Sequence, residues 1–148
     1  MKPATIQKRI AFAEGYANFD WTKVLWSDEM SIRLGPQGQT WVQRPIGAAW
    51  ILPTWAQAQA SWGCMSAAGV GECHLFVQNL ESFMKHILNK HLLQSARRFW
   101  PSGQWWFQQD NDPKHSSRLV QGWLNQKGID RLEWPPYSPD LNPIEHLV

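Results

Sequence analysis

Residues 105–110 read Trp-Trp-Phe-Gln-Gln-Asp, three aromatic side chains followed at once by polar ones. Such an apolar run is typical of a buried strand, and open sheets commonly bind ligands beyond the carboxyl ends of their strands. Asp110 is therefore a candidate functional residue. The residues that follow, Asn-Asp-Pro, also favour a turn, because Asn and Asp side chains bond to nearby backbone groups. A purely structural role for Asp110 in such a turn stays open.

The spacing of apolar residues along the chain predicts an α/β fold, with a mixed sheet flanked by helices. Strands are expected at residues 24–34, 62–66, 74–77, 105–107 and 129–134, with a hairpin partner for the first strand at 40–43 and a turn at 69–71. Helices are expected at residues 5–17, from Asn79 to Pro101, and at 119–127 with Gly128 as its stop, and a last helix at Asn142-Pro143. Residues 44–61 are expected to form an irregular segment.

The composition fits a single domain with a sizeable core, since 43% of the 148 residues are hydrophobic and 18% are charged. A net charge of +2 permits contact with phosphates without demanding it. No apolar run approaches the roughly 18–20 residues that cross a bilayer, and no secretory signal is evident, so an intracellular protein without membrane contact is expected. Cys64 and Cys73 match no zinc pattern and are expected in the core, as are most of the eleven tryptophans.

Two further acidic residues stand in unusual settings. Asp28 interrupts the apolar strand pattern Val-Leu-Trp-Ser-Asp-Glu-Met, where an acid is unfavourable unless it has a partner or faces solvent. Glu145 follows Asn142-Pro143-Ile144, where it could instead complete a capping box with Asn142. Carboxylates are hard ligands suited to Mg²⁺ or Mn²⁺, and two such ions about 3.5–4 Å apart can support in-line displacement at phosphorus.

Taken together, four motifs resemble the Tc/mariner superfamily of cut-and-paste DNA transposases: Trp-Ser-Asp28-Glu, Trp62-Gly-Cys, Gln-Gln-Asp110-Asn-Asp-Pro-Lys-His, and Trp134-Pro-Pro-Tyr-Ser-Pro-Asp-Leu-Asn-Pro-Ile-Glu145. The 34 residues between Asp110 and Glu145 match the Tc-like branch. The resemblance implies a ribonuclease H-like fold. It also implies a catalytic triad of Asp28, Asp110 and Glu145, which would bind two Mg²⁺ or Mn²⁺ ions for DNA strand cleavage and strand transfer.

The resemblance further implies double-stranded DNA as the partner, at transposon ends and at the target, a nuclear location, and a homodimer in full-length relatives. Lys114, His115 and Arg118 are candidate DNA contacts. Residues 1–20 are expected to form an N-terminal helix and linker, and residues 21–148 a catalytic core truncated after the third acidic residue. The alternative is a catalytically inactive transposon-derived remnant that keeps the fold and binds DNA weakly, with Arg97 and Arg98 among its contacts.

Overall fold

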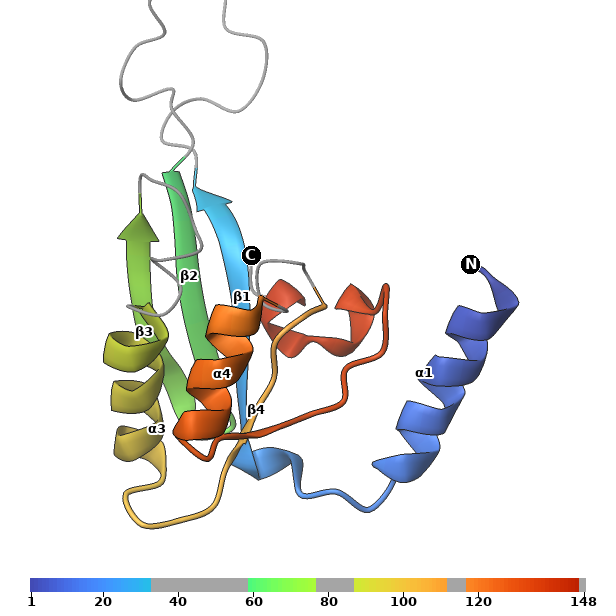
Figure 1. Cartoon of the computed structure of the whole chain (residues 1–148), viewed down its shortest axis with the longest axis horizontal. Helices are drawn as coiled ribbons and strands as arrows, with labels where there is room; N and C mark the ends of the chain where they lie inside the picture. The colour runs from blue at the N-terminus through green and yellow to red at the C-terminus, as the bar shows by residue number, and fades with distance from the viewer. Residues whose placement is uncertain (33–58, 77–86, 112–116, 147–148) are drawn as a thin grey trace, which may run out of the picture.

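The computed structural model describes residues 1–32, 59–76, 87–111 and 117–146 (Figure 1). Its helices and strands, in chain order, are α1 (Pro3–Gly15), η1 (Trp21–Lys23), β1 (Val24–Ile32), β2 (Gln59–Ser66), β3 (Gly69–Phe76), η3 (Leu88–Leu92), α3 (Leu93–Phe99), β4 (Trp106–Phe107), α4 (Arg118–Gln126), β5 (Asp130–Arg131), η4 (Pro139–Leu141) and η5 (Pro143–His146).

The strands form one five-stranded mixed sheet in the order β3-β2-β1-β4-β5. β1 and β2 pair antiparallel, as do β2 and β3, whereas β4 runs parallel to both β1 and β5. β1 is thus the central strand, with the antiparallel part of the sheet on one side and the parallel part on the other. This arrangement confirms the predicted α/β class.

Successive side chains of β1 point to opposite faces of the sheet, so this strand contributes to a buried cluster on each face. Leu25 belongs to one buried cluster, in which α3 and α4 contribute residues such as Ala96 and Leu124. Val24 and Trp26 belong to a second cluster with Leu132 and Trp134. α3 and α4 therefore cover one face of the sheet (Figure 1), and the second cluster lies on the other.

Helix α1 packs on the second cluster through aromatic side chains. Phe12 and Tyr16 lie against it, and the Phe12 ring meets the Trp134 ring edge-on at 5.3 Å between centroids. Tyr16 also accepts a hydrogen bond from the Glu133 amide at 3.4 Å. These contacts hold α1 close to the segment that leads to η5. The expected division of the chain after residue 20 stays a prediction.

Several expected elements differ in detail. The turn expected at residues 69–71 is wrong, because Gly69 begins β3 and the reversal falls at residues 67–68. β5 is shorter than the expected strand at 129–134, and the helix expected to open at Asn142-Pro143 is the short 3-10 helix η5. Cys73 is exposed, contrary to expectation, whereas Cys64 is buried. The strand at 40–43 and the start of the helix at Asn79 lie outside the described residues.

Two expectations from local signals hold closely. α4 spans Arg118–Gln126, with the Ser117 side chain accepting from the Val120 amide at its start. Gly128 follows its end with φ +63°, a conformation that glycine adopts without strain.

Candidate active site

The candidate site opens where β1 and β4 part. These strands pair only at Val24 with Trp106 and Leu25 with Phe107. One further ladder bond runs from the Gln108 amide to the Leu25 carbonyl oxygen at 3.0 Å. β1 then continues to Ile32 while β4 has ended. The edge of β1 that faced β4 therefore needs other hydrogen-bond partners from this point on.

Two buried amide side chains take the place of β4 beside Ser27. The Ser27 amide donates to Gln108 Oε1 at 3.2 Å, and the Ser27 carbonyl oxygen accepts from Asn142 Nδ2 at 3.3 Å. The Ser27 hydroxyl donates to the Gln108 carbonyl oxygen at 2.9 Å. At most 4% of any of these three residues is exposed, so each polar group would be costly to leave unpaired. The network joins the three motifs that carry the predicted acids.

Asp28 lies partly buried directly after Ser27, and its neighbour across the ladder is Gly63, which has no side chain. Burial raises the pKa of Asp28 from its ordinary 3.8 to about 6, although its hydrogen bond from the Glu29 amide acts in the opposite direction. The value of about 6 also includes the negative charge of Glu145, a hydrogen bond with its side chain and the negative charge of Asp110, which all act in the same direction as burial. The Asp28 carboxyl therefore lies within electrostatic reach of both other predicted acids.

Asp110 is exposed just beyond the end of β4. The Nδ2 of its neighbour Asn111 donates to the Trp134 carbonyl oxygen at 2.8 Å, which ties the segment after β4 to the segment after β5. Asp110 also lines an open groove of about 1180 Å³, whose walls include Lys8 of α1 and Asn125 of α4. A long substrate could approach Asp110 along this groove.

Glu145 is exposed in η5, which is anchored by the buried side chain of Ile144. Asn142 caps this turn as predicted: its Oδ1 accepts from the Ile144 amide at 3.4 Å, and its carbonyl oxygen accepts from the Glu145 amide at 3.2 Å. A capping box would need the Asn142 amide as partner of Glu145, but that amide donates to the Pro139 carbonyl oxygen at 2.9 Å. The capping-box alternative for Glu145 is therefore wrong.

The donor set of the three acids suits Mg²⁺ or Mn²⁺, because it consists of carboxylate oxygens. Within the described ranges, however, no three His, Cys, Asp or Glu residues are arranged so that they could hold a metal ion. Metal binding by Asp28, Asp110 and Glu145 stays a prediction.

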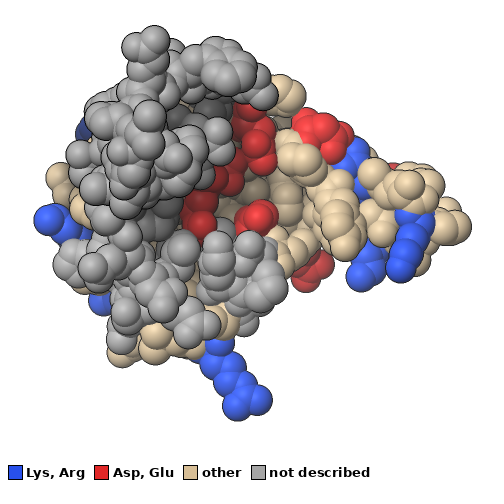
Figure 2. All heavy atoms as spheres, turned by 90° about the horizontal axis from the view of Figure 1, so that it is seen from above, with Lys and Arg blue, Asp and Glu red and all other residues tan. Residues whose placement is uncertain are grey.

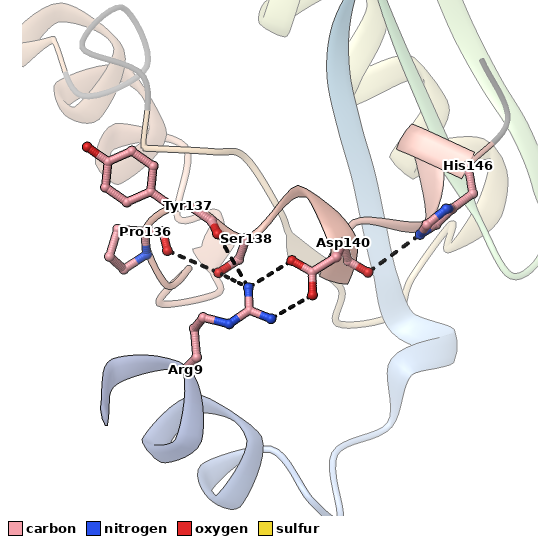
Figure 3. A network of polar contacts seen from close by, with 6 residues as sticks. All are labelled: Arg9, Pro136, Tyr137, Ser138, Asp140 and His146. Atoms are coloured by element: carbon pink, nitrogen blue, oxygen red, sulfur yellow. Dashed lines mark hydrogen bonds and ion pairs between the residues drawn. The ribbon is translucent and has the colours of Figure 1, made fainter. Parts of the chain in front are cut away.

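A polar network fastens α1 to the segment before η5 (Figure 3). The Arg9 guanidinium donates to both carboxylate oxygens of Asp140, at 2.8 and 2.6 Å, and to Ser138 Oγ at 2.8 Å. The His146 ring lies 3.5 Å from the Asp140 carbonyl oxygen. Arg9 holds the pKa of Asp140 below its ordinary value through these hydrogen bonds. The turn that carries Glu145 is thus bound to β1 directly, and to α1 only through η4, where Asp140 lies.

Acidic side chains gather in a hollow near the middle of the face shown in Figure 2, whereas Lys and Arg lie toward its margins. Of the candidate DNA contacts, Arg118 is exposed at the start of α4, and Lys114 and His115 lie outside the described residues. Arg97 and Arg98 are exposed at the end of α3, where Arg98 also lies 4.0 Å from Glu72.

The structure adds residues that the sequence patterns did not single out. Ser27 and Gln108 form part of the buried network, and Arg9 and Asp140 form the ion pair of Figure 3. For Ser27 and Gln108 the available signal was their position in the sequence. Both are polar residues within or directly after apolar strand runs, where a buried polar side chain needs a partner.

Three comparisons bear on the family. A family model described as "DDE superfamily endonuclease" matches residues 23–148. The Tc1 transposase of Caenorhabditis elegans is 34% identical over an alignment of 154 residues. The matched region covers 94% of this chain and 55% of that protein. The chain therefore spans about half the length of the curated relatives it matches.

Two solved structures have the same fold. A Mos1 transposase paired-end complex with the left transposon end has a TM-score of 0.75 at 18% identity, covering 99% of this chain and 47% of that one. A Mos1 mariner paired-end complex with Mn has a TM-score of 0.73 at 18% identity, with the same coverage. These structures confirm the predicted ribonuclease H-like fold, and the match to the Tc1 transposase confirms the resemblance to Tc-like transposases. The chain belongs to the DDE superfamily endonucleases.

Proposed function

We propose that this chain is the catalytic domain of a cut-and-paste transposase, which cleaves DNA strands and joins them to target DNA with Asp28, Asp110 and Glu145 as its triad. The observation that carries the proposal is the electrostatic influence of Asp110 and Glu145 on the Asp28 carboxyl. Asp28 and Glu145 stand 117 positions apart, so only the fold brings their charges together.

Mg²⁺ or Mn²⁺ bound by these carboxylates would supply Lewis-acid stabilisation of the attacking and leaving oxygens at phosphorus. Asp28 would be the most rigid ligand, because its strand is central in the sheet and its Oδ1 accepts from the Glu29 amide at 2.8 Å. Asp110 and Glu145 are exposed and so remain open to a substrate and to ions from solution.

A DNA strand is the proposed substrate. The solved Mos1 complex with a transposon end supports this choice, as does the groove whose wall includes Asp110. The amide side chains of Asn111 and Asn125 line the same groove and are suited to hydrogen bonds with phosphates or bases. A DNA substrate of this kind would place the protein in the nucleus. None of the helices in the described residues has the length and apolar content to cross a bilayer.

The test is nicking of a supercoiled plasmid by the purified chain with Mn²⁺, alongside Mn²⁺ binding followed by tryptophan emission. Asp28→Asn, Asp110→Asn and Glu145→Gln should each lower nicking by more than about a hundredfold, since losing a ligand costs more than losing a supporting residue. The fold should persist in all three variants, because each removes a repelling charge.

Glu14→Gln is the matched control, because it also neutralises an exposed acid but lies on α1 and does not line the groove. It should nick and bind Mn²⁺ as the unmodified chain does. Mn²⁺ binding or nicking that survives Asp110→Asn at full strength would contradict the proposed triad.

A catalytically inactive remnant that binds DNA weakly is a second candidate function. It is favoured by the lack of a ready-made metal-holding group in the part of the chain that the structure describes. Its test is duplex affinity against salt, since each neutralised phosphate contributes about −0.9 to the log–log slope. A negative slope without nicking would favour the remnant, and a slope near zero would exclude DNA binding through phosphates.

A further inference from the structure

We infer that Asn142 is a positioning residue, which sets the place of Glu145 relative to Asp28 by bridging the turn η5 to the open edge of β1. This inference rests on the proposed function, because it concerns the same three carboxylates. It goes beyond the capping role of Asn142, since a cap needs only the side-chain oxygen.

The bridge uses both ends of one side-chain amide. Nδ2 donates to the Ser27 carbonyl oxygen at 3.3 Å, directly before Asp28, and Oδ1 accepts from the Ile144 amide at 3.4 Å, directly before Glu145. One side chain thus connects the backbone on the N-terminal side of both acids. Asn142 is only 3% exposed, so the two bonds are shielded from water.

The Ser27 carbonyl needs this donor because β4 has ended. The Ser27 amide donates instead to Gln108 Oε1, so the segment before Asp110 also lies beside Ser27. If Asn142 lost its donor, a buried carbonyl would be left unpaired and η5 would lose its polar link to the strand. The turn would then be anchored by the buried side chain of Ile144 and, through the preceding segment, by the hydrogen bonds of Arg9.

Two substitutions separate the bridge from the cap. Asn142→Ser keeps an oxygen that can cap the turn, but its shorter side chain carries no amide donor for the Ser27 carbonyl. Asn142→Ala removes both functions. We expect Mn²⁺ affinity to fall at least about tenfold in both variants, as when a residue that orients a metal ligand is lost. Should Asn142→Ala fail to fold, Asn142→Ser carries the test.

Ser95→Ala is the matched control, because it also removes buried hydrogen bonds, to the Glu72 amide and the His91 carbonyl oxygen, but in the α3 region. At matched stability it should bind Mn²⁺ within twofold of the unmodified chain. A second measurement is hydrogen exchange without metal: Asn142→Ser should speed exchange at the Glu145 amide and leave β2 and β3 unchanged.

The outcomes are distinct. Mn²⁺ affinity within twofold of the unmodified chain in a folded Asn142→Ser variant would overturn the positioning role and leave the proposed function standing. Lack of any Mn²⁺ response in the unmodified chain would overturn the proposed function and this role with it. An equal loss in Ser95→Ala would show that only general stability is measured, and would also overturn the inference.

Discussion

Asp28 shows how a carboxyl of the proposed site can oppose folding. Its pKa in the folded chain is about 6 against an ordinary 3.8, chiefly because of burial. The unfolded chain therefore loses the proton at lower pH than the folded chain does. The ionised carboxylate destabilises the fold, and this cost grows as pH rises from about 4 to about 6 and is constant above that.

Asp28→Asn is accordingly expected to raise the free energy of unfolding of the metal-free chain by on the order of 1 kcal/mol at neutral pH. This figure is reduced to account for the partial exposure of the side chain to solvent. The Asn side-chain oxygen can still accept from the Glu29 amide. Urea denaturation at pH 3.5 and at pH 7 checks this, since the difference should vanish at the lower pH. A variant less stable than its parent at pH 7 would assign Asp28 a structural role.

At the scale of elements, Gly71 shows how closely β3 approaches β2 and α3. A side chain at Gly71 would place its Cβ 2.9 Å from the Cys64 carbonyl oxygen of β2 and 3.0 Å from Ser95 Oγ of α3. The first of these is backbone and cannot move aside. At Gly122 of α4, by contrast, a Cβ would meet nothing within 4 Å.

Gly71→Ala should therefore cost about 1–3 kcal/mol of stability, because the strand or helix must shift. Gly122→Ala should stabilise the chain by about 0.5–1 kcal/mol, because alanine is the better helix former. Chemical denaturation of the two variants under one condition measures both effects. Similar effects of the two changes would mean that β3 does not pack on β2 and α3 as described.

For the molecule as a whole, the ion pair of Arg9 and Asp140 couples the N-terminal helix to η4, the turn directly before the one that carries Glu145, across 131 positions of sequence. The contact is bidentate, the strongest geometry for such a pair, but it is open to solvent. Because the pKa of Asp140 is lowered, this stabilisation is present above the ordinary value of 3.8 and is lost as pH falls through the lowered pKa.

Arg9→Ala and Asp140→Ala should each speed hydrogen exchange in α1 and in residues 139–146, and the double variant should add little to either. High salt should reduce the difference from the unmodified chain. Lys8→Ala on the same helix is the comparison variant, since it removes a charge that is not part of the Figure 3 network. Additive effects of the two substitutions would mean that the ion pair does not couple these segments.

Much of the architecture could be predicted from local signals. α4 was identified by apolar spacing and by Gly128, and the capping role of Asn142 by its place before a proline. Errors arose where local signals conflicted with pairing: the glycines at 69 and 71 favour a turn, but both lie in β3, which pairs with β2 from Gly69 onward.

The sequence by itself determined the character of most of the described segments and singled out the three acids, because strand burial, helix spacing and turn residues act over a few neighbouring positions. Only the tertiary structure decided that Asp28 lies within reach of the charges of Asp110 and Glu145, and that Asn142 closes the gap that β4 leaves beside Ser27. The physical reason is that the Asn142–Ser27 bond joins residues 115 positions apart. Such a bond depends on where the strands part, and no local pattern of residues encodes that point.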